Sequence, residues 1–369
     1  MKVTIFSNSF QNLYNFRLNL IKFFIEKNIK VSLIASDDKY SDFFKKIGCD
    51  IFKLKIKKNS ISLISDFILL IKLYKILKNN PPDILFLYTI KPNIYGSIIS
   101  SILYIKYINT VTGLGTLALR GFLSKKLVFF LYKISFLKSN HIFFQNIYDY
   151  QYFFNKSISL YSNISIVPGS GVDLNKFFFT NKKFNKKINF IFVGRLIKDK
   201  GMMELLNAFN KILFEFSEIY LDIYGEIDPS NAASINKKII YKFNKIQNIN
   251  FLGYDDKIEN KYKKYDCLVL PSYREGCSKA ILEASASGLP VIASNVPGCN
   301  NIVLDNVNGY LCDPKSVNSL YNTIVKFIKL DIKNKIEMSL NGKNLIKNHF
   351  DEKIVIQEYY LKIKKYEKK

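Results

Sequence analysis

Short apolar runs alternate with longer amphipathic stretches along the whole chain of 369 residues. The runs predict strands at residues 3–6, 30–35, 51–54, 84–87, 108–111, 141–144 and 164–167 in the first half. In the second half they predict strands at 188–193, 220–224, 249–252, 267–270, 291–293 and 309–312. Helical periodicity between them, as at 13–27 and 61–77, indicates an α/β chain with parallel sheets covered by helices on both faces.

A chain of 369 residues is too long for one ordinary core. We expect two doubly wound, Rossmann-like domains facing a cleft, with residues 1–178 forming the first and 186–350 the second. The polar, lysine-rich stretch 175–187 is the best candidate for the linker. The long basic helix at 351–366, within the terminal segment 351–369, is expected to cross back to the first domain.

Hydropathy and cysteine content point to a cytoplasmic protein. The longest apolar stretch, 61–77, is interrupted by Asp66, Lys72 and Lys75, so no span of about 18–20 apolar residues predicts a transmembrane helix. The amino terminus reads as a first strand followed at once by polar residues, and not as a signal peptide. The five cysteines are an odd number without zinc-type spacing, which predicts reduced thiols.

The formal net charge of +25 suggests an anionic partner, although codon bias towards lysine would also produce it. The basic residues are spread along the chain without an arginine-rich stripe, so we expect an anionic membrane surface as a partner and no nucleic acid. The stretch 123–138 combines aromatic residues with lysines. It predicts either an interfacial helix or a core helix with a basic edge, and the two readings can hold together.

The strongest chemical signal is a pair of acids after the strand at 267–270. Glu275 lies in a polar loop and Glu283 lies on the apolar helix that follows. Ligands bind at the carboxyl ends of strands in open parallel sheets, and a helix amino terminus suits a phosphate. If the segment were all helix, the carboxylates would lie about 12 Å apart, close to the reach of a nucleoside diphosphate sugar.

A second signal follows the strand at 188–193. Gly194 and Arg195 come directly after it, and Lys200 precedes the next helix. An arginine can bind a diphosphate with two donors and a lysine can add a point charge, although a solvated loop with two ordinary cations would look the same. Such a clamp needs no divalent ion, and we find no metal-binding pattern, so we expect no metal or other cofactor.

Polar bends in the first half are weaker candidates for the acceptor side or a phosphate. Asn15 and Arg17 are assigned to the first strand-to-helix turn, and Thr112 and Gly113 follow a later strand. The two histidines, His141 and His349, are expected to be structural.

These residues resemble glycosyltransferase family 4, whose members are retaining enzymes of the GT-B fold. The resemblance covers essentially the whole chain and rests on the stretches 193–196, 200–201, 171–173, 291–293, 297–298 and 308–309, with Glu275 and Glu283 as the paired acids. The stretches 91–96, 112–115 and 271–276 resemble the bacterial branch that builds capsule, O-antigen and lipid-linked glycans, including N-acetylgalactosaminyltransferases.

The resemblance implies a nucleotide-sugar donor, UDP-linked, from which a hexose or N-acetylhexosamine passes to a lipid-linked acceptor of the undecaprenyl-diphosphate type. It implies that Arg195 and Lys200, beside Gly194, bind the donor diphosphate, and that Glu283 holds the ribose hydroxyls. Glu275 would contact the donor sugar, with the amides of Gly276, Cys277 and Ser278 completing the cradle. It also implies peripheral association with the inner face of the cell membrane.

Two departures from the family pattern affect the expectations. The first loop lacks the usual glycine pair, and Thr112 stands where many members have a histidine, so no catalytic histidine is carried over. Residues 277–279 also differ from the common aromatic or Pro-Arg sequence. The alternatives are an enzyme of the UDP-sugar 2-epimerase type on the same fold, which the scarcity of histidine disfavours, and a basic membrane- or nucleic-acid-binding protein.

Overall fold

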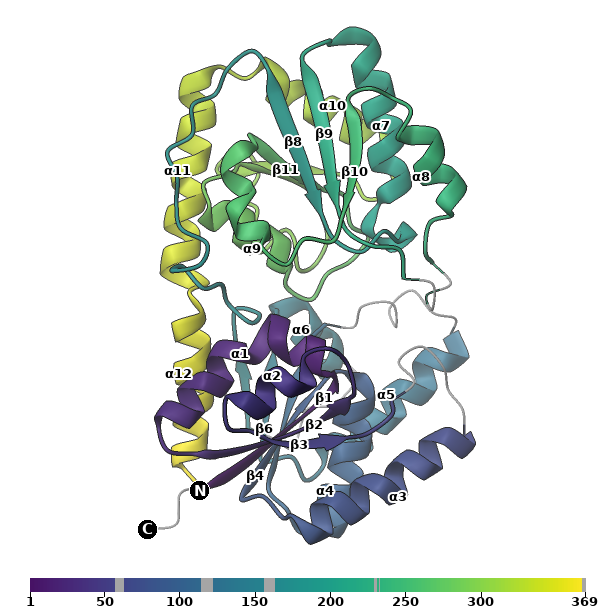
Figure 1. The fold of residues 1–369 in the computed structure, drawn as a ribbon, viewed down its shortest axis with the longest axis vertical. Helices are drawn as coiled ribbons and strands as arrows, with labels where there is room; N and C mark the ends of the chain where they lie inside the picture. The colour runs from purple at the N-terminus through teal and green to yellow at the C-terminus, as the bar shows by residue number, and fades with distance from the viewer. Residues whose placement is uncertain (57–62, 114–121, 156–162, 229–230, 232, 367–369) are drawn as a thin grey trace. The chain divides into compact units, whose positions relative to one another are not determined.

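The computed structural model describes residues 1–369 apart from 57–62, 114–121, 156–162, 229–230, 232 and 367–369. The chain forms two compact units, each with its own parallel sheet (Figure 1). The first unit contains Met1–Ser170 and Ile354–Lys369, and the second contains Gly171–Lys353. The prediction of two Rossmann-like α/β domains is therefore confirmed.

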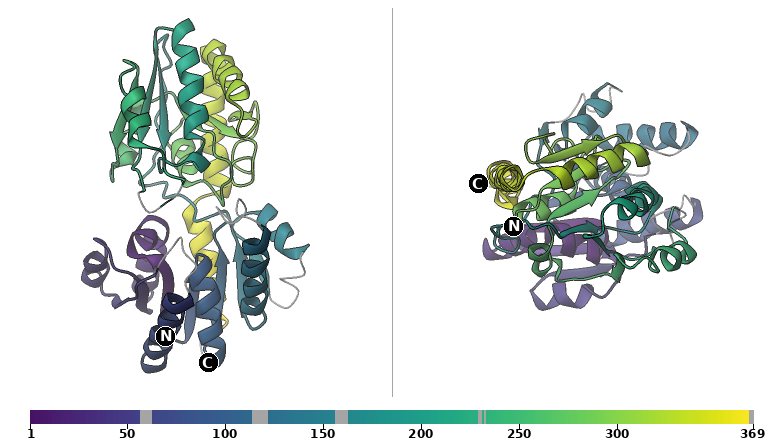
Figure 2. Two further views of the ribbon diagram at one scale, coloured as in Figure 1. Left: turned by 90° about the vertical axis from the view of Figure 1, so that its right-hand side faces the viewer. Right: turned by 90° about the horizontal axis from the view of Figure 1, so that it is seen from above.

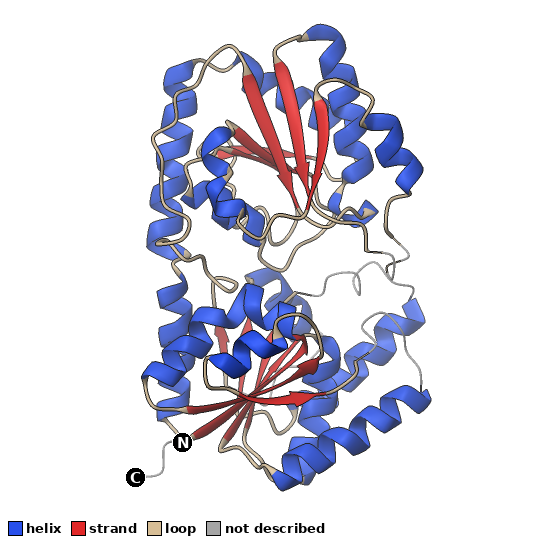
Figure 3. Ribbon diagram, viewed as in Figure 1, coloured by secondary structure: helices blue, strands red, loops and turns tan. Residues whose placement is uncertain are grey.

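The first unit has a seven-stranded parallel sheet with the order β3-β2-β1-β4-β5-β6-β7, drawn in red in Figure 3. Its strands are β1 (Lys2–Ser9), β2 (Lys30–Ser36), β3 (Asp50–Lys53), β4 (Ile84–Tyr88), β5 (Tyr107–Val111), β6 (His141–Phe144) and β7 (Ile164–Ile166). The central strands are buried on both faces, as expected for a sheet between two layers of helices.

Helices cover both faces of this sheet (Figure 2). One core joins the sheet to α1 (Phe10–Glu26), α2 (Ser41–Lys46) and α12 (Glu352–Lys364). The opposite side packs against α3 (Leu63–Asn79), α4 (Ser97–Ile102) and α5 (Phe122–Phe136). The π-helical turn η1 (Pro92–Gly96) leads into α4, and α6 (Ile147–Phe154) precedes β7.

The second unit has a six-stranded parallel sheet with the order β10-β9-β8-β11-β12-β13. Its strands are β8 (Ile188–Val193), β9 (Ile219–Tyr224), β10 (Ile249–Gly253), β11 (Cys267–Leu270), β12 (Val291–Ser294) and β13 (Gly309–Cys312). Its helices are α7 (Met202–Glu215), α8 (Lys237–Phe243), α9 (Lys279–Ala286), α10 (Val317–Lys329) and α11 (Ile332–His349), with short 3-10 turns at Lys198–Lys200, Ile258–Asn260 and Tyr262–Lys264.

The chain passes from one unit to the other after Ser170 and again after Lys353. These two passages are joined inside the second unit, where Val172 and Asp351 form a parallel bridge. Gly171 has φ +68°, and a Cβ there would lie 2.3 Å from the Cα of Glu352. The Gly-Val-Asp stretch seen in the sequence is thus required for this close backbone approach.

The expected linker is wrong in its placement. Residues 175–187 belong to the second unit, and Phe177 and Phe184 are buried in its hydrophobic core. The lysines that made the stretch look like a linker surround these two aromatic side chains in the sequence, so polar composition concealed a packed segment.

The carboxyl-terminal helix α12 packs in the first unit. Val355, Tyr359 and Ile363 are buried in the same core as β1 and β4. The ring of Tyr359 lies 4.3 Å from that of Phe143, and its hydroxyl shares a 2.8 Å hydrogen bond with Thr110. No helix in the described parts of the chain is both long and apolar enough to cross a membrane.

His141, at the start of β6, is buried. Its Nε2 atom and the hydroxyl oxygen of Ser165 on β7 are 3.1 Å apart and share a hydrogen bond. Burial, assisted by the charges of Lys362 and Lys365, lowers the pKa of His141 to about 4 from 6.5. Between pH 6.5 and about 4, the imidazole is therefore neutral in the folded chain and protonated in the unfolded chain.

We expect the first unit to lose about 2 kcal/mol of stability as pH falls from about 6.5 towards 4, because only the unfolded state binds the proton in that window. Hydrogen exchange of the β6 amides, corrected for intrinsic pH dependence, measures the loss. His141→Gln should remove this component, whereas the exposed-site control His349→Gln should retain it. An unchanged pH profile in His141→Gln would contradict the assignment.

Candidate functional site

The carboxyl end of β8 carries the first candidate residues. The backbone of Gly194 packs closely against Gly225, the residue after β9. A Cβ on Gly225 would lie 1.8 Å from the Gly194 carbonyl oxygen. Arg195 follows, with its side chain 57% exposed and its guanidinium 3.8 Å from Asp228. The arginine is therefore accessible for an anionic ligand, and its present counterion is a carboxylate in the same unit.

Lys200 ends the 3-10 turn η3 (Lys198–Lys200), and Gly201 then reverses the backbone into α7 with φ +69°. A side chain at Gly201 would be strained by this φ, and its Cβ would meet the Pro271 carbonyl oxygen at 2.0 Å. The glycine thus lets the turn after β8 pack directly against the loop after β11.

That loop, residues 271–278, is held from two sides by backbone hydrogen bonds. The Tyr273 amide donates to the Asp199 carbonyl at 2.8 Å. On the other side, the Glu275 amide donates to Pro297 and the Ser278 amide to Gly298, each at 3.1 Å. Gly298 has φ +82°, and a Cβ there would lie 2.5 Å from the Glu275 carbonyl.

Lys200 and Glu275 form an ion pair inside this assembly. Both side chains are mostly buried, at 19% and 13% exposure, and the hydroxyl of Ser272 also donates to Glu275 Oε1 at 2.7 Å. The structure therefore brings together two residues predicted from separate motifs. A cation and a carboxylate in this setting are pre-positioned for polar ligand groups of either charge.

Glu283 lies one turn into α9, at 8% exposure. The Tyr262 hydroxyl donates to Oε2 at 3.3 Å, and the Lys279 ammonium lies 3.6 Å from Oε1. Burial raises the pKa of the Glu283 carboxyl, while Lys279, Lys176 and the Tyr262 hydrogen bond oppose that rise. The acid is separate from the Lys200–Glu275 pair and has its own partners.

The segment between the two acids is partly loop and partly helix. Gly276 and Cys277 are half-buried in the loop, and Ser278 is buried immediately before α9. Burial and then the nearby Glu275 raise the pKa of the Cys277 thiol to about 12, which keeps it protonated. Only residues 279–286 are helical, so the distance of about 12 Å expected for a fully helical segment between the acids does not apply.

The predicted residues of the first unit are placed differently from the sequence assignment. Asn15 and Arg17 lie inside α1 and not in the turn before it, because Ser9 caps the helix by accepting from the Asn12 amide at 3.2 Å. Arg17 is only 4% exposed, and its guanidinium lies 4.3 Å from the Tyr88 ring centroid and 5.9 Å from that of Tyr359.

Thr112 and Gly113 follow β5 and are half-buried, with φ +103° at Gly113. The remainder of that predicted bend, 114–116, lies outside the described residues. The structure therefore places Thr112 directly after a strand of the first sheet, as expected.

Several partners of the site were missed by sequence reasoning: Ser272, Asp228, Tyr262 and Lys279. The i,i+4 spacing of Lys279 and Glu283 on α9 was a readable signal. No local pattern identified Tyr262 or Asp228, because both act across elements. Within the described ranges, the chain has no cluster of three or more histidine, cysteine or acidic residues that could hold a metal ion.

Comparison with family models accounts for most of the chain. The model described as Glycosyl transferases group 1 matches residues 173–345, which include the whole donor-side assembly. The model described as Glycosyl transferase 4-like matches residues 2–146.

Curated relatives align over most of their length. The chain is 26% identical to the capsular polysaccharide biosynthesis glycosyltransferase CapM of Staphylococcus aureus, covering 92% of this chain and 90% of that protein. It is 24% identical to N,N'-diacetylbacillosaminyl-diphospho-undecaprenol alpha-1,3-N-acetylgalactosaminyltransferase of Campylobacter jejuni, covering 97% of each. It is 30% identical to UDP-Gal:alpha-D-GlcNAc-diphosphoundecaprenol alpha-1,3-galactosyltransferase of Escherichia coli, covering 79% and 78%.

Solved structures share the fold at lower identity. Sucrose-phosphate synthase from Thermosynechococcus elongatus superposes with a TM-score of 0.82 at 17% identity, covering 99% of this chain and 98% of that one. Anabaena Alr3699/HepE, solved with UDP and glucose, gives 0.79 at 16% identity, covering 99% and 100%. The family models and the curated relatives show that the chain belongs to the group 1 glycosyltransferases and is a glycosyltransferase, and the likeness to solved structures shows that it has the GT-B fold.

Proposed function

We propose that this glycosyltransferase moves a hexose or N-acetylhexosamine, with retention of configuration, from a UDP-sugar to an undecaprenyl-diphosphate-linked acceptor at the inner face of the cell membrane. The observation that carries the proposal is the Lys200–Glu275 pair beside the separately held Glu283. The names of the Campylobacter and Escherichia relatives, both of which include a lipid diphosphate, support the choice of acceptor.

The arrangement suggests a division of roles within the donor site. Arg195 and Lys200 bind the diphosphate and stabilise the charge that develops on it as the glycosidic bond breaks. The carboxylate of Glu283 accepts hydrogen bonds from the ribose hydroxyls, and Glu275 accepts them from the sugar. The amides around Gly276, Cys277 and Ser278 complete the sugar and phosphate cradle.

Retention follows from attack on the face that the leaving group departs from. The acceptor oxygen bonds to the anomeric carbon as the bond to phosphate oxygen breaks, and the acceptor proton passes to the departing phosphate. This scheme requires no catalytic histidine. Asn15, Thr112 and Gly113 are proposed acceptor-side residues, whereas the burial of Arg17 against two tyrosine rings favours a supporting role for that cation.

Lys200→Met and Glu275→Gln should each lower kcat/KM by about 10²–10³, since each removes a charge that acts on the transition state. Transfer from a panel of UDP-sugars to a short-chain diphospho-sugar acceptor measures the effect. Lys198→Met, on the same turn, and Glu218→Gln, at an exposed position, are the matched controls and should remain near wild type. Near-normal transfer by both site variants would sink the assignment.

Donor affinity should fall on acidification, because only ionised Glu283 accepts two ribose hydroxyl hydrogen bonds. Burial raises the pKa of this carboxyl, so the loss should begin at a higher pH than for an ordinary glutamate. Calorimetric titration with UDP-glucose measures it. In wild type the hydrogen bond from Tyr262 lowers the pKa of Glu283. Tyr262→Phe removes that bond and should therefore move the midpoint to still higher pH.

Glu283→Gln serves as the control for that titration. It should bind more weakly and show no such pH dependence, with circular dichroism confirming that the protein stays folded. The same midpoint in wild type and Glu283→Gln would assign the dependence to another group.

Transfer should persist in excess EDTA, because Arg195 and Lys200 supply the positive charge that a divalent ion would otherwise provide. Initial rates with and without the chelator test this expectation. Abolished transfer that Mn²⁺ restores would show that a metal is required.

A further inference from the structure

The outward side of α3 carries four exposed apolar residues. Ile64, Phe67, Ile68 and Ile71 are 78%, 64%, 48% and 42% exposed. Their spacing places them on one side of the helix, opposite the buried Leu69, Leu73 and Leu77. Contiguous exposed apolar residues of this kind mark an interaction surface.

The same helix is positively charged on its outward side. Lys72, Lys75 and Lys78 are exposed, whereas the helix's one acid, Asp66, is 7% exposed and lies 2.5 Å from the ammonium of Lys91. The acid is thus turned inward and neutralised, and only positive charge faces outward. This distribution is complementary to an anionic surface.

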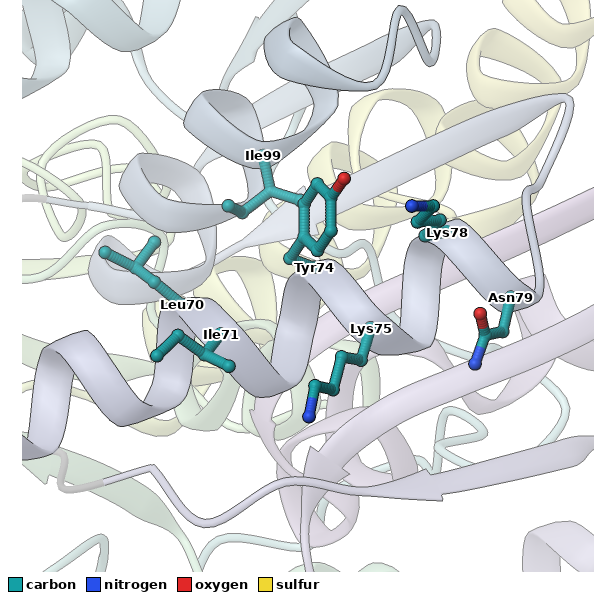
Figure 4. Close-up of a pocket in the computed structure, with 7 residues that line it drawn as sticks. All are labelled: Leu70, Ile71, Tyr74, Lys75, Lys78, Asn79 and Ile99. Carbon is teal, nitrogen blue, oxygen red and sulfur yellow. The ribbon is translucent and has the colours of Figure 1, made fainter.

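A groove opens beside the basic end of the helix. Its volume is about 600 Å³, and it is lined by Leu70, Ile71, Tyr74, Lys75, Lys78, Asn79 and Ile99 (Figure 4). Figure 4 shows the Tyr74 ring beside Ile99 of α4, with Lys78 on the ring's other side and Lys75 pointing away. The Lys78 ammonium lies 5.6 Å from the Tyr74 ring centroid. The groove therefore has apolar side chains along its walls and a positive charge at one end.

Helix α5 repeats the pattern on the same side of the sheet, with α4 in contact with both helices. Leu127, Phe130 and Ile134 are exposed at helical spacing beside the exposed Lys133, and the exposed Leu137 and Lys138 follow directly after the helix. On the other side of the helix, Phe129, Tyr132 and Phe136 are buried in the core. The helix therefore packs in the core on one side and exposes apolar residues on the other. The side chain of Lys125 lies outside the described residues.

We propose that α3 and α5 dock the first unit on an anionic phospholipid leaflet, with their outward apolar side chains among the acyl chains. Lys78, beside the Tyr74 ring, then binds a headgroup phosphate at the groove, and Lys75 binds one next to it. The inference rests on the proposed lipid-linked acceptor and names the surface that brings the enzyme to it. Pairing of two copies through this face would bring at least ten exposed lysines together, which disfavours that occupant.

The chain contains no tryptophan, so a single introduced indole reports its own surroundings. Phe67→Trp in the full-length protein should show a blue-shifted emission with phosphatidylcholine–phosphatidylglycerol vesicles and a smaller shift with phosphatidylcholine alone. Phe214→Trp, at an 84% exposed position on α7, is the matched control and should not shift. Equal behaviour of the two probes would overturn the proposal.

Vesicle co-sedimentation separates the apolar and charged contributions. Phe67→Ser should weaken partitioning about tenfold through lost apolar burial, whereas Phe214→Ser should not. Lys75→Gln with Lys78→Gln should weaken binding to anionic vesicles about 25-fold, since one lysine near such a surface is worth about fivefold. The control pair Lys237→Gln and Lys238→Gln, exposed on α8, should bind as wild type.

Transfer to a short-chain, water-soluble acceptor distinguishes this inference from the proposed activity. The α3 variants should transfer normally to that acceptor while losing vesicle binding. Normal vesicle binding by those variants refutes the docking surface whatever the transfer rate, and failed transfer by wild type refutes the proposed activity alone. A dimer in light scattering that Phe67→Ser dissociates would identify a second copy as the occupant instead.

Discussion

The donor-side site depends on two places where backbone packs against backbone. Gly201 lies against the carbonyl of Pro271, and Gly298 lies against the backbone of Glu275. Because a Cβ at either position would collide with backbone atoms, only glycine lets the loop 271–278 pack this closely against both neighbours. That packing holds the backbone of Glu275 where its side chain pairs with Lys200.

Each charged residue of this site already has an internal partner. Glu275 pairs with Lys200, Arg195 with Asp228, and Glu283 with Lys279 and Tyr262. A partly buried charge without a partner would carry a desolvation cost, and these contacts offset it. A nucleotide sugar would therefore exchange one set of charged contacts for another. Selectivity then depends on how well the incoming groups match the geometry.

The first unit uses its charges in a different way. Arg17 is buried against Tyr88 and Tyr359, and Tyr359 belongs to the carboxyl-terminal helix α12. The guanidinium face is satisfied by aromatic rings and not by an acid, which suits arginine better than lysine. The last helix of the chain thus completes the surroundings of a residue near its start. On the opposite side of the sheet, the lysines of α3 are exposed, whereas its one acid, Asp66, is turned inward and pairs with Lys91.

Local sequence pattern was sufficient for the fold: it located the strands of both sheets and the parallel alternation, since burial of a strand or a helix face leaves a periodic trace within a few residues. The same pattern, with its family resemblance, selected Arg195, Lys200, Glu275 and Glu283 as candidates. It misassigned 175–187 as a linker, because the polar composition of the stretch concealed two buried phenylalanines. It misassigned Arg17 to a turn, because the cap at Ser9 starts the helix before that residue.

Only the tertiary structure decided which candidates meet. Lys200 and Glu275 are 75 positions apart, and their pairing depends on adjacent strands β8 and β11 and on backbone contacts at two glycines. Tyr262 reaches Glu283 from a separate 3-10 turn, and the outward stripe of α3 is recognisable only once its inward side is known. These contacts join segments distant in the chain, and the free energy that selects them comes from packing across elements, which has no period along the sequence.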